Sequence, residues 1–531
     1  MSDAVPMDVA RMDNVPSRPV PNKYLVAGTV MIGTLMEVID TSVANVSLPH
    51  IQGTYSAGVD EITWVITSYL VANAVILPLS GWLGNYFGRK RSYLTCLVLF
   101  TLASIGSGAA VSLPMLIAMR VLQGLAGGAM VPMSQAILLE SFPRHEHGKA
   151  MALFGVGVIF GPIVGPTLGG FITDTIGWRW VFYINAPLGL IGGLLGYLFI
   201  VDPPYLKRPE GRIDYLSFLF IALGLGSLEI LLNRGQRYDW FASPRIQVYA
   251  LLTVLGLALF TWRSLTAKRP LVDLRVFRSR PFFVGTMLMF LLGFGLFGSF
   301  TMLPLFVQHM LGYTATLAGL VLSPGGVMSL IAMAFVGNLI GRVDTRLLIT
   351  FGVVLNIACL VILQHVYLGV DFRYVAIPRL MQGFGLGFIF VPLTAIAFAG
   401  LRPEQMGQAT GLFNLLRNEG GSVGIAMSST VLARHAQMHG GHLSENFTNA
   451  NAALATNLTA MTRGLGAAAG VDPTTAQDMA WRTLGKQVGG QAMVLAYNDV
   501  FWLLTLTFVL FLPFLLLLGG SVKRGKAPPG H

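Results

Sequence analysis

Two carboxylates lie within an apolar stretch near the start of the chain. Glu37 and Asp40 are three residues apart, so a helix would present both on one face. A carboxylate in hydrocarbon is costly, and burial with a like-charged neighbour favours its protonated form. The pair therefore predicts a proton-binding site that faces a cavity. A purely structural role for Asp40, in hydrogen bonds to neighbouring helices, is the alternative.

Three arginines also lie in apolar stretches. A buried guanidinium needs a carboxylate or several carbonyl groups, so Arg120, which shares a helix face with Gln123, is predicted to pair with the acids. Arg417 belongs to the same group of candidates for proton coupling or substrate binding, and an interhelical or snorkelling arginine is the alternative. We interpret Arg379, near the outer end of its stretch, as a member of a structural ion pair.

The composition shows what must hold these residues. Of the 531 residues, 54% are hydrophobic and 11% are charged, against about 25% charged in soluble domains. The apolar residues fall in runs of roughly 20, the length of a transmembrane helix. This pattern excludes a soluble enzyme, a nucleic-acid-binding protein and a disordered chain. Cys96 and Cys359 both lie inside apolar runs, which excludes a disulfide framework.

The runs predict an all-α integral membrane protein with fourteen transmembrane helices. Lys and Arg gather in the segments on the same side as the N-terminus, which places both termini in the cytoplasm and accounts for the net charge of +11 without nucleic acid. The predicted spans are 24–48, 62–83, 92–112, 114–139, 150–173, 180–201, 214–233, 247–265, 282–308, 316–340, 347–369, 374–399, 409–433 and 494–519.

The chain contains an internal repeat. Arg120-Val-Leu-Gln-Gly matches Arg379-Leu-Met-Gln-Gly, and Gly148-Lys-Ala-Met-Ala-Leu-Phe matches Gly407-Gln-Ala-Thr-Gly-Leu-Phe, with the same offset of 259 (379 − 120 and 407 − 148). Both arginines fall in spans of the same orientation, so the halves are parallel repeats.

The repeat divides the chain into two bundles with an insertion between them. The outer segment 434–490 is rich in Ala, Asn, Thr and Gln, and an amphipathic helix is possible over 450–465. The predicted parts are a cytoplasmic tail (1–23), an N-terminal six-helix bundle (24–201), a linker with two extra transmembrane helices (202–281), a C-terminal six-helix bundle that includes the outer loop 434–490 (282–519) and a second cytoplasmic tail (520–531).

Five motifs resemble those of the major facilitator superfamily, and within it the fourteen-span drug:proton antiporters of the EmrB/QacA type, the EmrB branch above all. The motifs are Ile39–Pro49, Gly81–Arg91, Arg120–Gly128, Gly161–Gly170 and Trp178–Pro187. The resemblance implies the major facilitator fold and a part for Asp40 and Arg120 in proton coupling. It also implies two groups of residues that control conformation: Gly81, Gly88, Arg89 and Lys90 in the first, and Gly161, Gly165, Pro166, Gly169 and Gly170 in the second.

The chain departs from the family pattern at two positions. Asn85 stands where the family has an acidic residue, so the charge relay that holds one conformation is weakened or missing. Ala152 stands in the place of the first glycine of the fifth-span motif.

The expected function is proton-coupled export of hydrophobic or amphipathic toxic compounds from a bacterial inner membrane, driven by the proton gradient and without cofactors. An exporter of an endogenous metabolite, lipid or siderophore is the alternative. We expect no enzyme activity and no metal site, because no nucleophile–base pair and no cluster of metal ligands appears in the sequence. A receptor or scaffold without flux is disfavoured by the intramembrane acids. Expected partners are small-molecule substrates, protons, membrane lipids, a periplasmic adaptor of the EmrA type and an outer-membrane channel of the TolC type, but no nucleic acid.

Overall fold

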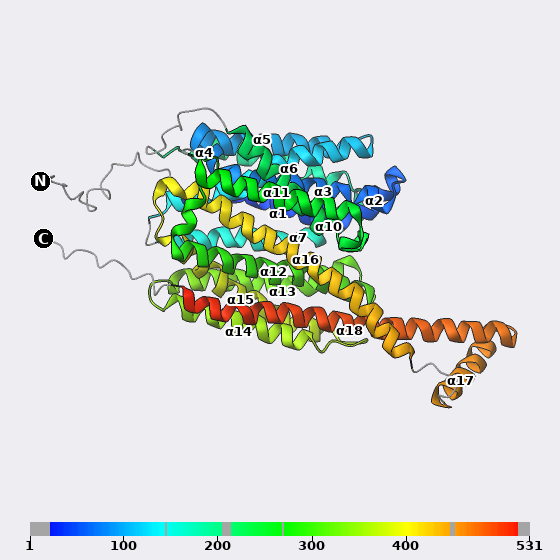
Figure 1. Cartoon of the computed structure of the whole chain (residues 1–531). Coiled ribbons are helices and arrows are strands. Elements are labelled where there is room, and N and C mark those ends of the chain that lie inside the picture. The colour runs from blue at the N-terminus through cyan, green and yellow to red at the C-terminus, as the bar shows by residue number, and fades with distance from the viewer. Residues whose placement is uncertain (1–21, 144–145, 204–213, 268–269, 446–451, 519–531) are drawn as a thin grey trace, which may run out of the picture.

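The computed structural model describes residues 22–143, 146–203, 214–267, 270–445 and 452–518. Within these ranges, helices are the only extended regular elements, with one isolated bridge between Ile340 and Val343. The helices lie side by side in a bundle, and a helical protrusion leaves one end (Figure 1). We call the end at which α1 begins and α18 ends the terminal end, and the opposite one the far end. Residues 1–21 of the first predicted tail and all of the second (520–531) lie outside the described residues.

The first half of the bundle runs from α1 to α9. Its second span is built from three consecutive helices and the short 3-10 helix η2 (Leu77–Leu79), which continue one another from Asp60 to Phe87. The helices are α1 (Lys23–Tyr55), α2 (Val59–Ile62), α3 (Trp64–Ile76), α4 (Ser80–Phe87), α5 (Arg89–Gly108), α6 (Leu113–Ser141), α7 (His147–Thr175), α8 (Trp180–Tyr183) and α9 (Asn185–Phe199).

Two helices lie between the halves in the sequence. They are α10 (Tyr215–Arg234) and α11 (Pro244–Thr266), and they cross at Gly224 and Gly256, where a side chain on either glycine would collide with the other helix. The second half contains α12 (Arg280–His309), α13 (Ala315–Leu339), α14 (Thr345–Leu363), α15 (Phe372–Ala399), α16 (Met406–Ser444), α17 (Ala452–Ala469) and α18 (Pro473–Leu517).

Twelve helical segments among the described residues are long and apolar enough to cross a membrane, which makes the chain a multi-pass membrane protein. Helices α5 and α16 are not in this set. Both carry more polar residues, yet both pack within the bundle and coincide with the predicted spans 92–112 and 409–433. Each of the fourteen predicted spans therefore coincides with a helix, and α5 and α16 are less apolar than the other twelve.

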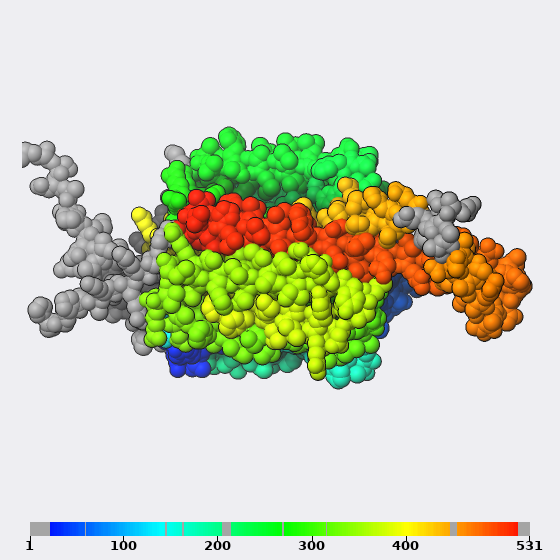
Figure 2. Space-filling view, turned by 90° about the horizontal axis from the view of Figure 1, so that it is seen from below, coloured from blue at the N-terminus to red at the C-terminus, as the bar shows by residue number. Residues whose placement is uncertain are grey.

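The segment predicted as outer loop 434–490 is mostly helical. Helix α16 continues to Ser444, α17 packs against α18, and α18 begins at Pro473, far ahead of the predicted span 494–519. We call this protrusion the helical hairpin (434–444, α17 and 473–493); Figure 2 shows it projecting beyond the body of the bundle. Asp472 caps α18 by accepting hydrogen bonds from the backbone N–H groups of Thr474 and Thr475. The amphipathic helix expected over 450–465 corresponds to α17.

The two halves touch closely toward the terminal end. A side chain on Gly81 of α4 would collide with the backbone of Gly407 at the start of α16. Deeper in the bundle, Asn414 of α16 donates a hydrogen bond of 2.6 Å to Gln135 of α6. These contacts join the halves near the terminal end of the bundle, where α4, α6 and α16 meet.

Candidate proton-coupling site

Helix α1 carries the two acids. Glycines of α7 pack against α1, and glycines of α6 pack against the neighbouring helix α3. On α6, Gly124 and Gly128 lie so close to α3 that a Cβ atom on Gly124 would come within 2.4 Å of the Tyr69 carbonyl oxygen. Because α3 and α6 touch along their backbones, side chains from both helices reach the same point on α1. This brings Arg120, Tyr69 and Asp40 together.

Asp40 and Arg120 form a buried ion pair. Arg120 Nη1 lies 2.6 Å from Asp40 Oδ2, and both residues are 1% exposed. The guanidinium also donates through Nε to the Val65 carbonyl at 3.1 Å and through Nη1 to Gln123 at 2.8 Å. The predicted partnership of Arg120 with an intramembrane acid is therefore present, although one guanidinium nitrogen rather than two contacts the carboxylate.

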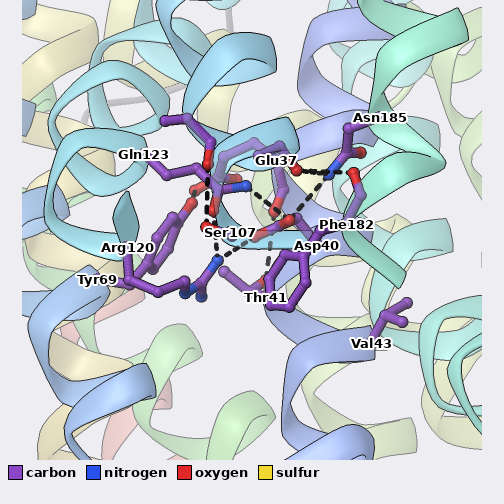
Figure 3. A network of polar contacts seen from close by, with 12 residues as sticks. Glu37, Asp40, Thr41, Val43, Tyr69, Ser107, Arg120, Gln123, Phe182 and Asn185 are labelled. Atoms are coloured by element: carbon purple, nitrogen blue, oxygen red, sulfur yellow. Dashed lines mark hydrogen bonds and ion pairs between the residues drawn. The ribbon is translucent and has the colours of Figure 1, made fainter. Parts of the chain in front are cut away.

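The other oxygen of Asp40 is held by two amides. Gln123 Nε2 donates to Oδ1 at 2.7 Å, and Asn185 Nδ2 from α9 donates to the same atom at 2.9 Å (Figure 3). Asn185 also donates to Ser104 on α5. Asp40 thus accepts hydrogen bonds from three side chains and connects α1, α6 and α9.

Glu37 has a different environment. Its Oε1 accepts hydrogen bonds from the Tyr69 hydroxyl at 3.1 Å and from Asn73 Nδ2 at 3.0 Å, both on α3. Neither donor is charged, and no cation among the described residues lies within ion-pair distance of this carboxylate. The two acids of α1 therefore differ: Asp40 is fixed by a cation, whereas Glu37 is held by neutral groups.

Arg417 belongs to the opposite half of the bundle and interacts electrostatically with Glu37. It is buried, Nε and Nη2 contact only the Asn418 side-chain oxygen, and Nη1 has no hydrogen-bond partner in the described part of the chain. The second half thus holds an incompletely hydrogen-bonded guanidinium that attracts an acid of the first half without forming an ion pair with it.

The repeat reproduces the Arg120 network in the second half without its carboxylate. Arg379 donates to Gln382 and, at 3.1 Å, to Ser299 Oγ. Ser299 stands at the offset of Asp40, since 299 − 40 = 259. The interpretation of Arg379 as a member of an ion pair is wrong, because no acid among the described residues lies within 4 Å of it and its Nε is unpartnered.

The fifth-span glycines bring α7 against the acid-bearing part of α1. Added Cβ atoms would come within 2.4 Å of Val38 at Gly161, within 2.3 Å of Ser42 at Gly165 and within 2.7 Å of Val43 at Gly169. Pro166 and the buried Gly170 lie in the same helix. Helix α7 therefore approaches α1 closely at three of the five residues of this motif.

Comparisons with known proteins agree with this architecture. The family model of the Major Facilitator Superfamily matches residues 30–425. The chain belongs to this superfamily. It is 34% identical to the multidrug export protein EmrB of Escherichia coli (strain K12) over 97% of this chain and 98% of EmrB. The fatty acid resistance protein FarB of Neisseria gonorrhoeae is 34% identical over 80% of this chain and 83% of FarB.

A solved major facilitator structure has the same fold. The double Trp mutant of XylE superimposes with a TM-score of 0.61 at 15% identity and covers 94% of this chain and 97% of its own. With the sequence relatives, this makes the chain a major facilitator transporter of the EmrB type.

The loop motif of the superfamily lies where the halves meet. Gly88 adopts φ +93° between α4 and α5, a conformation that favours glycine, and the backbone N–H of Lys90 donates to Asp202 at 2.8 Å. Arg89 is 1% exposed and pairs with Glu140 on α6 at 3.0 Å. The Asn85 side-chain oxygen is buried without a partner among the described residues, so Arg89 uses Glu140 instead of an acid at position 85.

A small, largely apolar cavity lies next to Arg379. It is lined by Ile159 of α7 and by Phe300, Leu322, Leu386 and Arg379 from the second half. Both halves of this major facilitator protein therefore contribute to the cavity, whose polar lining is Arg379 and Gln382 and whose volume of about 10 Å³ suits a single water molecule.

Four residues of the site were missed from the sequence. They are Val65, Tyr69, Asn73 and Asn185, all from α3 or the start of α9. Asn73 and Asn185 had a readable signal, because an amide in an apolar run needs a partner. Val65 had none, because its contribution is a backbone carbonyl.

Proposed function

We propose that the chain is a proton-coupled multidrug exporter of the drug:H⁺ antiporter type. It would cross a bacterial inner membrane fourteen times with both termini in the cytoplasm, and take its energy from the proton gradient without a cofactor. The observation that carries the proposal is the buried Asp40–Arg120 pair, one helical turn from a carboxylate that has only neutral donors. Intramembrane acids of this kind are functional by default.

Glu37 is the proposed proton carrier. When ionised it attracts Arg417 across the boundary between the halves, and protonation removes that attraction. The free energy of interaction between α1 and α16, and so between the two halves, therefore changes when Glu37 binds or releases a proton. Alternating access by rocking of two bundles requires such a change. Asp40, held by Arg120 and Gln123, fixes the geometry of α1 while Glu37 titrates.

The proposal is tested in proteoliposomes with an imposed pH gradient and a lipophilic fluorescent dye as probe. The wild-type chain should drive dye accumulation when the gradient is present, and dissipating the gradient should abolish it. Glu37→Gln should bind the dye and lose gradient-driven transport. Glu404→Gln, an exposed acid in the short helix before α16, is the matched control and should transport normally. Gradient-driven transport by Glu37→Gln at the wild-type rate would refute the assignment.

Hydrophobic or amphipathic compounds are the proposed substrates. The name of the relative EmrB, a multidrug export protein, supports this class. Export of a lipid-like compound is the second candidate, favoured by the similarity to FarB, which is named for fatty acid resistance. Flux of a fatty acid but not of chemically unrelated dyes would favour the second candidate over the first.

The helical hairpin is proposed to dock a periplasmic adaptor of the EmrA type, and through it an outer-membrane channel of the TolC type. Two long helices that leave the bundle together and are capped by α17 form a rigid extension, which suits docking better than a solvated loop. Removing α17 (452–469) and joining its neighbours should spare flux in proteoliposomes while abolishing drug resistance in cells and co-purification with the adaptor. Unchanged resistance and co-purification would show that the hairpin is dispensable.

A further inference from the structure

Three potential metal ligands converge where the helical hairpin leaves the bundle. His435 and His439 are one turn apart on α16, and Asp499 faces them from α18. His435 Nδ1 and His439 Nε2 each lie 2.7 Å from Asp499 Oδ2, and the three ligand atoms lie within 4.8 Å of one another. A four-residue spacing on a helix points two imidazoles to the same side, so the helix itself positions the pair.

The cluster is accessible from solvent. The side chains of His435, His439 and Asp499 are 39%, 24% and 37% exposed. The nearest charged neighbour on α16, Arg434, lies 3.6 Å from Asp239, so its guanidinium has an acid of its own. An ion can therefore reach the cluster, and a water molecule has room to complete its coordination.

We propose that His435, His439 and Asp499 form a binding site for a divalent transition metal of the zinc class. Two imidazole nitrogens and one carboxylate oxygen are three of the four ligands of a tetrahedral site, with water as the fourth. Magnesium and calcium prefer sets of oxygen ligands, so the site selects against them. Since the ligands come from α16 and α18, a bound ion links the two helices at the base of the hairpin and restricts their relative movement.

The tautomer of each imidazole distinguishes the metal site from a hydrogen-bonded cluster. With no ion, His435 Nδ1 and His439 Nε2 each carry the N–H that donates to the Asp499 carboxylate, which only accepts. A metal ion binds the unprotonated nitrogen of a neutral imidazole, so in the metal site these two nitrogens carry no proton and each ring proton lies on the other nitrogen.

The test uses purified full-length protein stripped with a chelator. Calorimetric titration with Zn²⁺ should give one site per chain and raise the melting temperature, whereas Mg²⁺ should do neither. Co²⁺ should produce the visible absorption of a tetrahedral site. His435→Ala and Asp499→Asn should each weaken Zn²⁺ binding by more than about 100-fold, since loss of outer-sphere partners alone costs 10- to 100-fold.

His442→Ala is the matched control, because His442 is an exposed histidine of the same helix outside the cluster. This variant should bind Zn²⁺ as the wild type does. Absence of Zn²⁺ binding by the wild type overturns the proposal without reference to any variant. Binding that survives His435→Ala and Asp499→Asn, or that His442→Ala weakens equally, overturns it by assigning the ion to another place.

Discussion

Replacing Asp40 by Asn removes the charge of the buried pair and leaves a side chain of nearly the same size. Three donors converge on the Asp40 carboxylate, from Arg120, Gln123 and Asn185. An Asn side chain has one accepting oxygen, so its NH₂ group must face at least one of these donors. Arg120 is also left buried without an acid. Removing one partner of a buried ion pair costs about 3–5 kcal/mol, and we expect Asp40→Asn to lower the free energy of unfolding by this amount.

A double-mutant cycle separates the pair from the rest of the site. Arg120→Gln alone should cost a similar amount, because it leaves the Asp40 carboxylate buried with only amide partners. The double variant Asp40→Asn/Arg120→Gln is neutral at both positions. Its loss of unfolding free energy should be smaller than the sum of the two single losses by about 1–3 kcal/mol. Gradient-driven efflux should be lost in all three variants, because none of them retains the Asp40–Arg120 pair that is proposed to fix the geometry of α1 while Glu37 titrates.

Unfolding by a graded denaturant in detergent gives the stabilities, and dye flux in proteoliposomes gives the activity. Asp174→Asn is the control, since this exposed acid lies 3.9 Å from His50 at the surface and its loss should cost no more than about 1 kcal/mol. Strictly additive single effects would refute the ion-pair argument. Efflux at the wild-type rate in the recovered double variant would refute a part for Asp40 in coupling.

Three further changes test the surroundings of the pair. Arg120→Lys should lose transport, because one ammonium nitrogen cannot replace guanidinium contacts that point in three directions; a fully active Lys variant would show that charge alone suffices. Asn185→Ala should lower the free energy of unfolding by about 1–3 kcal/mol and reduce efflux partially, since two hydrogen bonds are lost; unchanged melting would contradict this. Gly165→Val should be poorly folded or inactive, because its Cβ would lie 2.3 Å from Ser42, whereas Gly28→Val, which meets nothing within 4 Å, should behave as wild type in melting and flux assays.

The parts of the site that were predictable follow from the cost of burying charge. Arg120 lies in an apolar run, so an acid had to be nearby, and Asp40 is its partner. The repeat also predicts the absence of an acid beside Arg379. The offset of 259 places Ser299 at the position that corresponds to Asp40, and Arg379 donates to Ser299 in the structure. Glu37 and Asp40 looked alike in sequence, and only the positions of α3 and α6 give them different partners.

The hairpin was the least predictable element. Ala and Gln favour helix whereas Asn and Thr do not, so the mixed composition of 434–490 did not indicate whether a helix or a loop would form. The apolar run beginning near residue 494 marked the membrane-facing part of α18 rather than the start of the helix, because hydrophobicity reports burial in lipid and not helix length.

The absence of side chains along one edge of α7 has a mechanical consequence. With Gly161, Gly165 and Gly169 in contact with α1, only the short side chains of Val38, Ser42 and Val43 lie between the two backbones, so neither helix can slide along the other without a collision. The opposite edge of α7 meets α13, where Thr167 abuts Gly319. Any tilt of α1 that follows protonation is thus carried through α7 as a rigid displacement to the boundary with the second half. The stiffness of the unit formed by α1 and α7 then determines how much of a local change at Glu37 becomes motion of the whole bundle.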